Sequence, residues 1–269
     1  MDVVTYVDAV AGVVKRDLRV FLSYRLRFVA QILSAFFSVI LFYYVSRLVH
    51  VGAFPSHKAY FGFTVVGLVI LGTLVSTLSH LPGRVRQELV AGTFERFILS
   101  PFGPVAGVAS LTVFPFLMSL VTGVVTIAFA VSAFGMPVRW STAALAVPSA
   151  VLGGLAFLPL ALLIAAAVIV VKQAESGVGF IVSGISLIGG FFFPVTLLPN
   201  WIEWMSHVQP FTPTLELLRN VLVGTPMQDS AWLTLVKICV WAVILLPLST
   251  LVLAHAIRLG QRRGTVIEY

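Results

Sequence analysis

Long stretches without a charged residue dominate this chain. A helix needs about 20 apolar residues to cross the hydrocarbon core of a membrane, and six uncharged runs reach or nearly reach that length: 28–46, 59–83, 97–138, 140–171, 176–202 and 238–257. These runs lack the polar–apolar alternation of barrel strands, and only helices and closed barrels satisfy the backbone within lipid. The pattern therefore predicts an all-α integral membrane protein with six transmembrane helices, in a domain over 28–257. The expected spans are about 28–49, 59–81, 105–134, 142–171, 177–198 and 231–257.

The longest uncharged run, 97–138, needs trimming before it is read as one span. Its first part, Phe97 to Pro104, contains two prolines and a serine and is typical of a loop. We expect one tilted helix over 105–134, bent at Pro115. Two short helices joined within the membrane are the alternative.

Composition supports a membrane protein and excludes several other classes. Only 10% of the 269 residues are charged and 59% are hydrophobic, whereas soluble domains carry about 25% charged residues. A soluble enzyme, a disordered regulator and a nucleic-acid-binding domain are therefore poor fits. The single cysteine, Cys239, excludes a disulfide framework and a cysteine-based metal cluster.

The basic residues predict the orientation of the spans. With six spans both termini share one side, and 12 of the 17 Lys and Arg residues fall on that side. The positive-inside rule then places both termini in the cytoplasm, including a tail over 258–269.

The N-terminal segment 1–27 is predicted to be an amphipathic helix on the cytoplasmic membrane surface. Its acidic residues and the lack of an apolar core exclude a cleavable signal. Its apolar residues recur at helical spacing: Val3, Val7, Val10, Val14, Leu18 and Phe21. This pattern fits a simple anchor and an element that transmits motion equally well.

The cytoplasmic loop 82–104 carries charges of both signs among apolar residues. Pro82 and Gly83 are predicted to end the second span, and Gly92 to divide the loop into two short helical pieces. Such a loop suits a docking surface, where apolar groups enter a groove and charges set the register. An ordinary basic loop is the alternative.

This loop resembles that of the ABC type-2 exporter permeases, which reads approximately Arg-Glu-x-Gly-Thr-Leu-Glu-x-Leu-Leu-x-Ser-Pro. Gly92, Thr93, Glu95, Ser100 and Pro101 match it by type and spacing, and Glu88 matches its acidic residue. Val90-Ala91 shifts the approach to the glycine, and phenylalanines replace two leucines. In that family the loop is the coupling helix that contacts a nucleotide-binding subunit. The resemblance thus implies eight ATPase-coupling residues: Arg86, Glu88, Gly92, Thr93, Glu95, Arg96, Ser100 and Pro101.

A second unusual segment, 189–226, lies between the last two predicted spans. Prolines interrupt it, and short interrupted helices at membrane depth must be buried in protein or face a wet cavity. We expect re-entrant helices over 199–226, on the outer side, with a tryptophan-bearing face and lipid contact for Phe191-Phe192-Phe193. The same family has Phe-Pro, Leu-Pro-x-Trp and Pro-x-Thr elements here. The residues expected at an outer gate or along a substrate path are Phe193, Pro194, Pro199, Trp201, Pro210, Pro213, Glu216 and Arg219. Glu216 and Arg219 are three apart on a helix, and the sequence leaves a structural ion pair and a gate both open.

Several chemistries have no support in the sequence. The chain contains no phosphate-binding loop, no clustered metal ligands and no charge in the middle of a predicted span. Ion-coupled carriers usually need such a charge.

We therefore expect a membrane-spanning ABC exporter permease that is not itself an enzyme, in a prokaryotic cytoplasmic membrane. ATP and Mg would be bound by a separate ABC-type ATPase subunit, and a second copy or a paralogue would complete the path. The expected substrate is an amphipathic or hydrophobic compound: a drug, a lipid, or a glycolipid or polysaccharide. The alternative is an ion-coupled carrier or a membrane scaffold.

Overall fold

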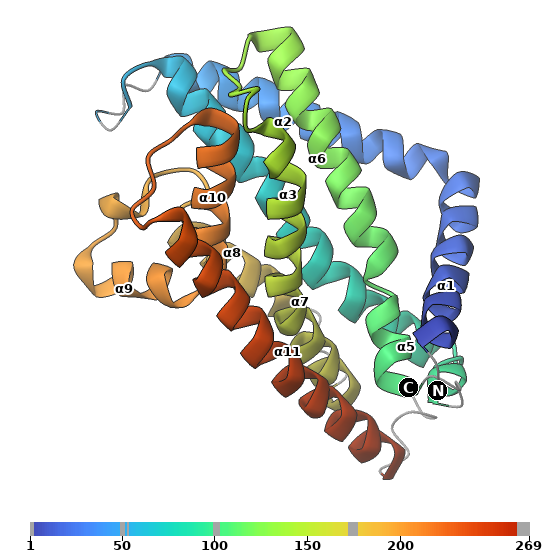
Figure 1. The fold of residues 1–269 in the computed structure, drawn as a ribbon. Helices are drawn as coiled ribbons and strands as arrows, with labels where there is room; N and C mark the ends of the chain where they lie inside the picture. Colours follow the sequence, from blue (N-terminus) through green and yellow to red (C-terminus); the bar gives the residue numbers. More distant parts are fainter. Residues whose placement is uncertain (1–2, 49–51, 53, 99–102, 172–176, 263–269) are drawn as a thin grey trace.

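The computed structural model describes residues 3–48, 52, 54–98, 103–171 and 177–262, and every regular element in these ranges is helical (Figure 1). The all-α fold class is therefore confirmed for the described chain. The α-helices are α1 Val3–Ser23, α2 Arg25–Leu48, α3 His57–Val90, α4 Glu95–Ile98, α5 Pro104–Ser110, α6 Val113–Phe134, α7 Ala146–Val171, α8 Val178–Ile188, α9 Asn200–Val208, α10 Phe211–Val223 and α11 Ala231–Arg262. Two 3₁₀ turns, η1 Ala143–Leu145 and η3 Val195–Leu197, join them.

Five stretches of helix in the described chain are long and apolar enough to cross a membrane, and each overlaps one of the predicted spans. They are Phe28–Leu48, His57–Val90, Pro104–Phe134, Ala143–Val171 and Ala231–Arg262.

The predicted span 177–198 is wrong as a continuous helix. α8 has 11 residues, which gives a rise of about 16 Å against a hydrocarbon core of about 30 Å. The helix stops at Gly189, and Gly190 follows in the left-handed region with φ of 72°. Six spans are therefore not confirmed, although the five long helices are joined to this shorter sixth piece.

The predicted helix end at Pro82-Gly83 is also wrong. α3 continues through both residues and ends at Val90, so it is 34 residues long, or about 51 Å. A proline within a helix loses one hydrogen bond. Here Pro82 and its apolar neighbours Leu78, Leu81 and Val85 are all buried. Burial of this stripe therefore outweighs the local penalty, and the end of α3 extends beyond the apolar part of the span.

The predicted helix 105–134 consists of two pieces, α5 and α6, separated at Leu111 and Thr112. The break lies near the predicted bend, because Pro115 has no N–H to donate to the carbonyl of Leu111 four residues earlier. α6 thus begins at Val113, and Pro115 occupies its first turn. Together the two pieces form one candidate span of 31 residues.

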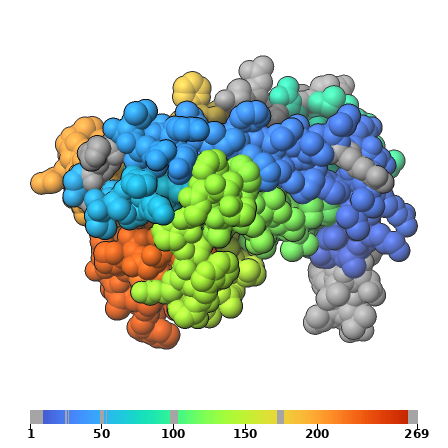
Figure 2. Space-filling view, turned by 90° about the horizontal axis from the view of Figure 1, so that it is seen from above, coloured from blue at the N-terminus to red at the C-terminus, as the bar shows by residue number. Residues whose placement is uncertain are grey.

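α3 and α7 form the centre of the bundle. Within their most apolar windows 72% and 61% of the residues are buried, compared with 6% in α2 and 11% in α11. Figure 2 shows the blue surface of α1 and α2 along one side of the molecule. The outer helices expose large apolar side chains, as expected where lipid or a second subunit covers them.

Glycines permit close contacts within the centre. A Cβ at Gly153 of α7 would lie 2.2 Å from the Thr214 methyl group of α10, and one at Gly154 would lie 2.1 Å from the ring of Phe116 in α6. Small residues that let neighbouring helices approach are typical of membrane bundles.

The two ends of the bundle differ. In Figure 1, α1, α5 and the C-terminal part of α11 lie at the lower right, whereas α9, α10 and the start of α3 lie at the left. The described parts of both terminal helices thus lie at the same end, together with the end of α3. The sidedness of these ends in a membrane stays a prediction.

Candidate functional site

The chain reverses direction directly after α3. The carbonyl of Glu88 accepts hydrogen bonds from the N–H groups of Thr93 and Phe94, at 2.9 and 3.1 Å. Gly92 makes the reversal possible with φ of 66°, a conformation that costs glycine little. The two helical pieces predicted for this loop are therefore the last turns of α3 and the short helix α4.

Two phenylalanines anchor α4 to the bundle. Phe94 and Phe97 are 1% and 9% exposed, and their ring centroids lie 5.9 Å apart. Both positions of the loop therefore bury a large apolar side chain.

Two of the predicted coupling residues bond within the loop. The hydroxyl of Thr93 donates to the carboxylate of Glu88, and Arg16 of α1 lies 4.0 Å from the same carboxylate. Glu88 and Thr93 therefore fix the shape of the turn.

The side chains that point outward from this turn define a surface that we call the coupling surface. It consists of the exposed residues Arg86, Gln87, Val90, Glu95 and Arg96. Val90 is an apolar side chain that is 62% exposed, and the other four residues are polar, with charges of both signs. Ser100 and Pro101 lie outside the described residues. Gln87 and Val90 are additions to the predicted set.

An ion pair joins α1 to the last turns of α3, close to this turn. Asp17 is only 3% exposed, and its Oδ1 accepts hydrogen bonds from Arg84 of α3 at 2.8 Å and from Arg16 at 3.1 Å. Phe21 extends the contact, with its ring 5.0 Å from Phe28 and 5.8 Å from Phe114. α1 thus packs on protein as well as bearing an apolar face.

Sequence reasoning missed Asp17 and Arg84 as functional candidates. The available signal was the position of Asp17 between Val14 and Phe21 on the apolar face of the predicted helix. An acid at such a position needs a partner when the face is buried. Leu18, assigned to the same face, is 41% exposed, so only part of that face is covered by protein.

The segment 189–226, which we call the outer segment after its predicted side of the membrane, begins where α8 ends. Phe191 is completely buried, and the ring of Phe192 stacks on Phe42 of α2 with centroids 5.2 Å apart. The expectation that the three phenylalanines contact lipid is therefore wrong for Phe191. Phe193 and Pro194 are half-buried beside the turn.

Arg219 of α10 is the best-connected charged residue of the outer segment. It is 4% exposed, and its guanidinium donates to the carbonyls of Phe63 at 3.1 Å, Gly190 at 2.8 Å and Phe191 at 2.7 Å. The guanidinium carbon also lies 3.3 Å from the centroid of the Phe63 ring. No ion pair to Glu216 is found among the described residues, so Arg219 is held by backbone carbonyls.

The remaining predicted outer residues occupy α9 and the start of α10. Trp201 and Trp204 are 74% and 58% exposed on one face of α9, as predicted. Pro199 precedes that helix and is exposed. Pro210 and Pro213 are buried around the first turn of α10, where a proline removes no helical hydrogen bond.

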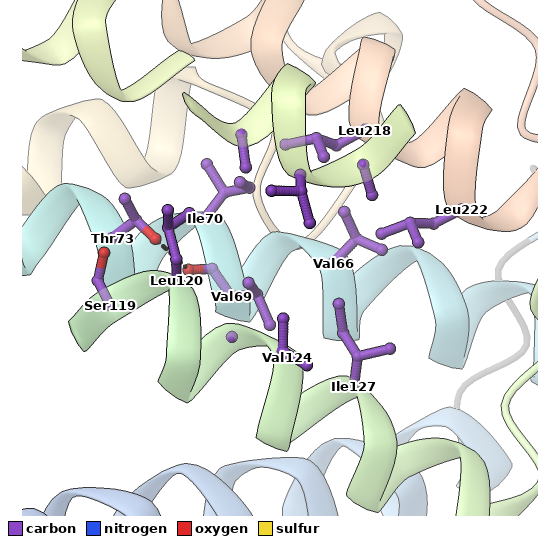
Figure 3. Close-up of a pocket in the computed structure, with 14 residues that line it drawn as sticks. Val66, Val69, Ile70, Thr73, Ser119, Leu120, Val124, Ile127, Leu218 and Leu222 are labelled. Atoms are coloured by element: carbon purple, nitrogen blue, oxygen red, sulfur yellow. Dashed lines mark hydrogen bonds between the residues drawn. The ribbon is translucent and has the colours of Figure 1, made fainter. Parts of the chain in front are cut away.

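A small apolar pocket lies between α3, α6, α7 and α10 (Figure 3). Its volume is about 60 Å³, and its two side-chain hydroxyls belong to Thr73 and Ser119. Both hydroxyls already donate to carbonyls of their own helices, Val69 at 3.2 Å and Phe116 at 2.7 Å. The pocket therefore offers apolar contact and little polarity. The described residues also contain no group of three or more His, Cys, Asp or Glu side chains placed to hold a metal ion.

Five helices long and apolar enough to cross a membrane, packed into one bundle, are the features of a multi-pass helical membrane protein. The family model described as ABC-2 type transporter matches residues 10–223. The chain therefore belongs to the ABC-2 type transporter family. The match extends from α1 to the end of α10 and so includes both candidate sites. A comparison with curated proteins found no match.

Proposed function

We propose that this permease is the membrane-spanning subunit of an exporter driven by a separate ABC-type ATPase subunit. The observation that carries the proposal is the coupling surface, where exposed Val90 and exposed charges of both signs lie around a hydrogen-bonded turn. Such a surface suits a protein partner. Burial of the apolar side chain in the interface favours binding, and the charges fix how the two proteins are aligned. ATP and Mg would be bound by that partner, and this chain would not be an enzyme by itself.

The internal bonds of the turn support this role. Phe94 and Phe97 hold α4 in the core, while the Asp17–Arg84 pair ties the end of α3 to α1. A force applied to the coupling surface would therefore move α3 and α1 together. Because α3 is a continuous helix of 34 residues, displacement of its cytoplasmic end reaches the outer end without passing through a loop.

The proposed passenger is an amphipathic or hydrophobic compound, such as a drug, a lipid, or a glycolipid or polysaccharide. The pocket in Figure 3 is lined almost entirely by apolar side chains of four helices. The exposed tryptophans of α9 offer flat aromatic surfaces near the proposed exit. A second copy or a paralogue would complete the path in a prokaryotic cytoplasmic membrane, with both termini in the cytoplasm.

An ion-coupled carrier or a scaffold is the competing function. A carrier would need a titrating or ion-binding group within the path. The middles of α3, α6 and α7 carry no Asp, Glu, Lys or Arg, and the pocket hydroxyls are already bonded. These features favour a pump whose energy comes from outside the membrane domain.

Inverted membrane vesicles test both the energy source and the direction. A lipophilic fluorescent dye and a fluorescently tagged phospholipid serve as probes. We expect ATP to drive accumulation of at least one probe inside vesicles that contain the chain and its ATPase, with no effect of a protonophore. Uptake that requires an ion gradient and ignores ATP would contradict the proposal. Glu95→Arg reverses a charge on the coupling surface and tests its role in coupling. Lys58→Glu reverses a charge in the first turn of α3, at the opposite end of that helix, and is the matched control.

A further inference from the structure

The contacts of Arg219 join three parts of the chain that are distant in sequence. Arg219 belongs to α10, Phe63 to α3, and Gly190 and Phe191 to the turn after α8. All three acceptors are backbone carbonyls. A buried charge is tolerated only when hydrogen bonds replace its lost hydration. Arg219 therefore has a strong preference for the arrangement in which the turn lies against α3.

Gly67 makes that arrangement possible. A Cβ at this position would lie 1.9 Å from the carbonyl oxygen of Phe191 and 3.0 Å from Nη2 of Arg219. The carbonyl of the turn therefore rests directly on the backbone of α3, in a space that a side chain would fill. Gly67 leaves space for the carbonyl group of Phe191, and Arg219 donates a hydrogen bond to that same carbonyl.

The turn itself is built from residues that favour bending. Gly190 has φ of 72°, and Pro194 starts the extended connection to η3. On either side the helices are short, with 11 residues in α8 and nine in α9. Besides the guanidinium, the hydroxyl of Thr212 lies 3.4 Å from the carbonyl of Gly189. Among the described residues, Arg219 thus makes the shorter polar contacts between this turn and α10, and Thr212 makes a longer one.

We propose that Arg219 is the latch of the outer segment. Its bonds to the carbonyls of Gly190 and Phe191 hold the turn Gly189–Pro194 against α3, and breaking them lets the turn and α9 move away. This inference rests on the proposed function, because an outward path needs an element that opens. Arg219 is a positioning residue in this account, since it acts through the turn and not on a passenger.

Cysteine labelling tests the latch without a transported compound. The background is Cys239→Ser, which removes the single native cysteine, and Phe193→Cys places a thiol at a half-buried position within the turn. The protein is reconstituted in nanodiscs without nucleotide and exposed to a hydrophilic maleimide. We expect Arg219→Lys to raise the labelling rate several-fold, because an ammonium cannot reproduce the fork of donors that joins two neighbouring carbonyls.

Two controls separate the latch from a general loss of structure. Arg139→Lys changes an exposed arginine at the α6–α7 connection and should leave the rate unchanged. A thiol introduced at an exposed position, by Thr196→Cys, should react at the same rate with and without the Arg219→Lys change. Thermal unfolding and size-exclusion chromatography identify the folded fraction that is labelled.

The result that overturns the latch is an unchanged rate at Phe193→Cys in folded Arg219→Lys protein. Failure to recover any folded Arg219→Lys protein would also overturn it, because a latch must open without unfolding the bundle. Failure of the proposed function is distinguishable. In the complex with the co-purified ATPase, ATP and vanadate should change labelling of Phe193→Cys in the protein with Arg219 intact. Absence of that response, with a positive result in the nucleotide-free arm, would retain the latch and reject ATP-driven opening.

Discussion

Asp17 of α1 and Arg84 of α3 are 67 residues apart in the sequence, yet their charged groups lie 2.8 Å from each other. Asp17 is buried, while the side chain of Arg84 is 33% exposed. The pair fastens the N-terminal helix to the end of the longest helix in the described chain. It stands beside the coupling surface, so α1 is positioned to follow any displacement there.

Asp17→Asn should loosen α1 without unfolding the bundle. A hydrogen bond to a charged group contributes about 1.5–3 kcal/mol, and partial exposure of Arg84 and Arg16 places the loss near the lower value. Trypsin should then cleave at Lys15, Arg16 and Arg19 several-fold faster than in the unmodified protein. Asp229→Asn is the matched control, because it removes a pair with Lys237 at the other end of the molecule. Equal cleavage rates in the two variants would contradict the role of Asp17.

Phe94→Ala should release α4 from the core. Truncation of a buried phenylalanine costs about 3–5 kcal/mol, and here the loss falls on a short segment at the edge of the bundle. Hydrogen–deuterium exchange should therefore increase over residues 88–98 and stay slow in α7. The control is Phe180→Ala, because the side chain of Phe180 is 84% exposed. If exchange over 88–98 were unchanged in Phe94→Ala, the buried ring would not be the anchor of the turn.

Gly67→Ala should destabilise the protein, whereas Gly72→Ala in the same helix should not. The added methyl group at Gly67 would meet the carbonyl of Phe191, and nothing lies within 4 Å of a Cβ at Gly72. Overpacking of a filled site costs about 1–3 kcal/mol, while alanine in an open helical position gains about 0.5–1 kcal/mol. Thermal unfolding in nanodiscs measures both changes. Similar melting temperatures for the two variants would show that the turn does not press on α3.

The sequence predicted the apolar core of the fold well, because long uncharged runs are a direct consequence of membrane burial. It failed where packing overrules a local signal. Pro82 normally ends a helix, but its buried neighbours continue α3 to Val90. The run 176–202 is apolar enough for a span, yet Gly189 and Gly190 divert the backbone. Hydropathy alone does not distinguish a crossing helix from a buried turn.

For the candidate sites too, the sequence predicted local features and did not predict contacts between distant residues. The motif coincides with a turn of the backbone, and Arg86, Glu95 and Arg96 are exposed there, while their docking role stays a prediction. Contacts between residues distant in the sequence could not be predicted. No sequence pattern pairs Asp17 with Arg84, or Arg219 with the carbonyls of Gly190 and Phe191. Every residue has a backbone carbonyl, whatever its type. A buried arginine that is bound to backbone carbonyls therefore cannot be predicted from composition or spacing.

The central claim is that a separate ATPase engages the coupling surface. The most direct measurement is purification of the chain from its native membrane in mild detergent, with quantification of any ATPase subunit that accompanies it. We predict a stoichiometric ATPase with the unmodified chain and at least a tenfold reduction with the double variant Glu95→Arg, Arg96→Glu, at equal membrane abundance and unchanged thermal stability. Retention of the ATPase by that variant would contradict docking at this surface, and a chain that arrives alone under conditions preserving a known exporter complex would contradict the claim itself.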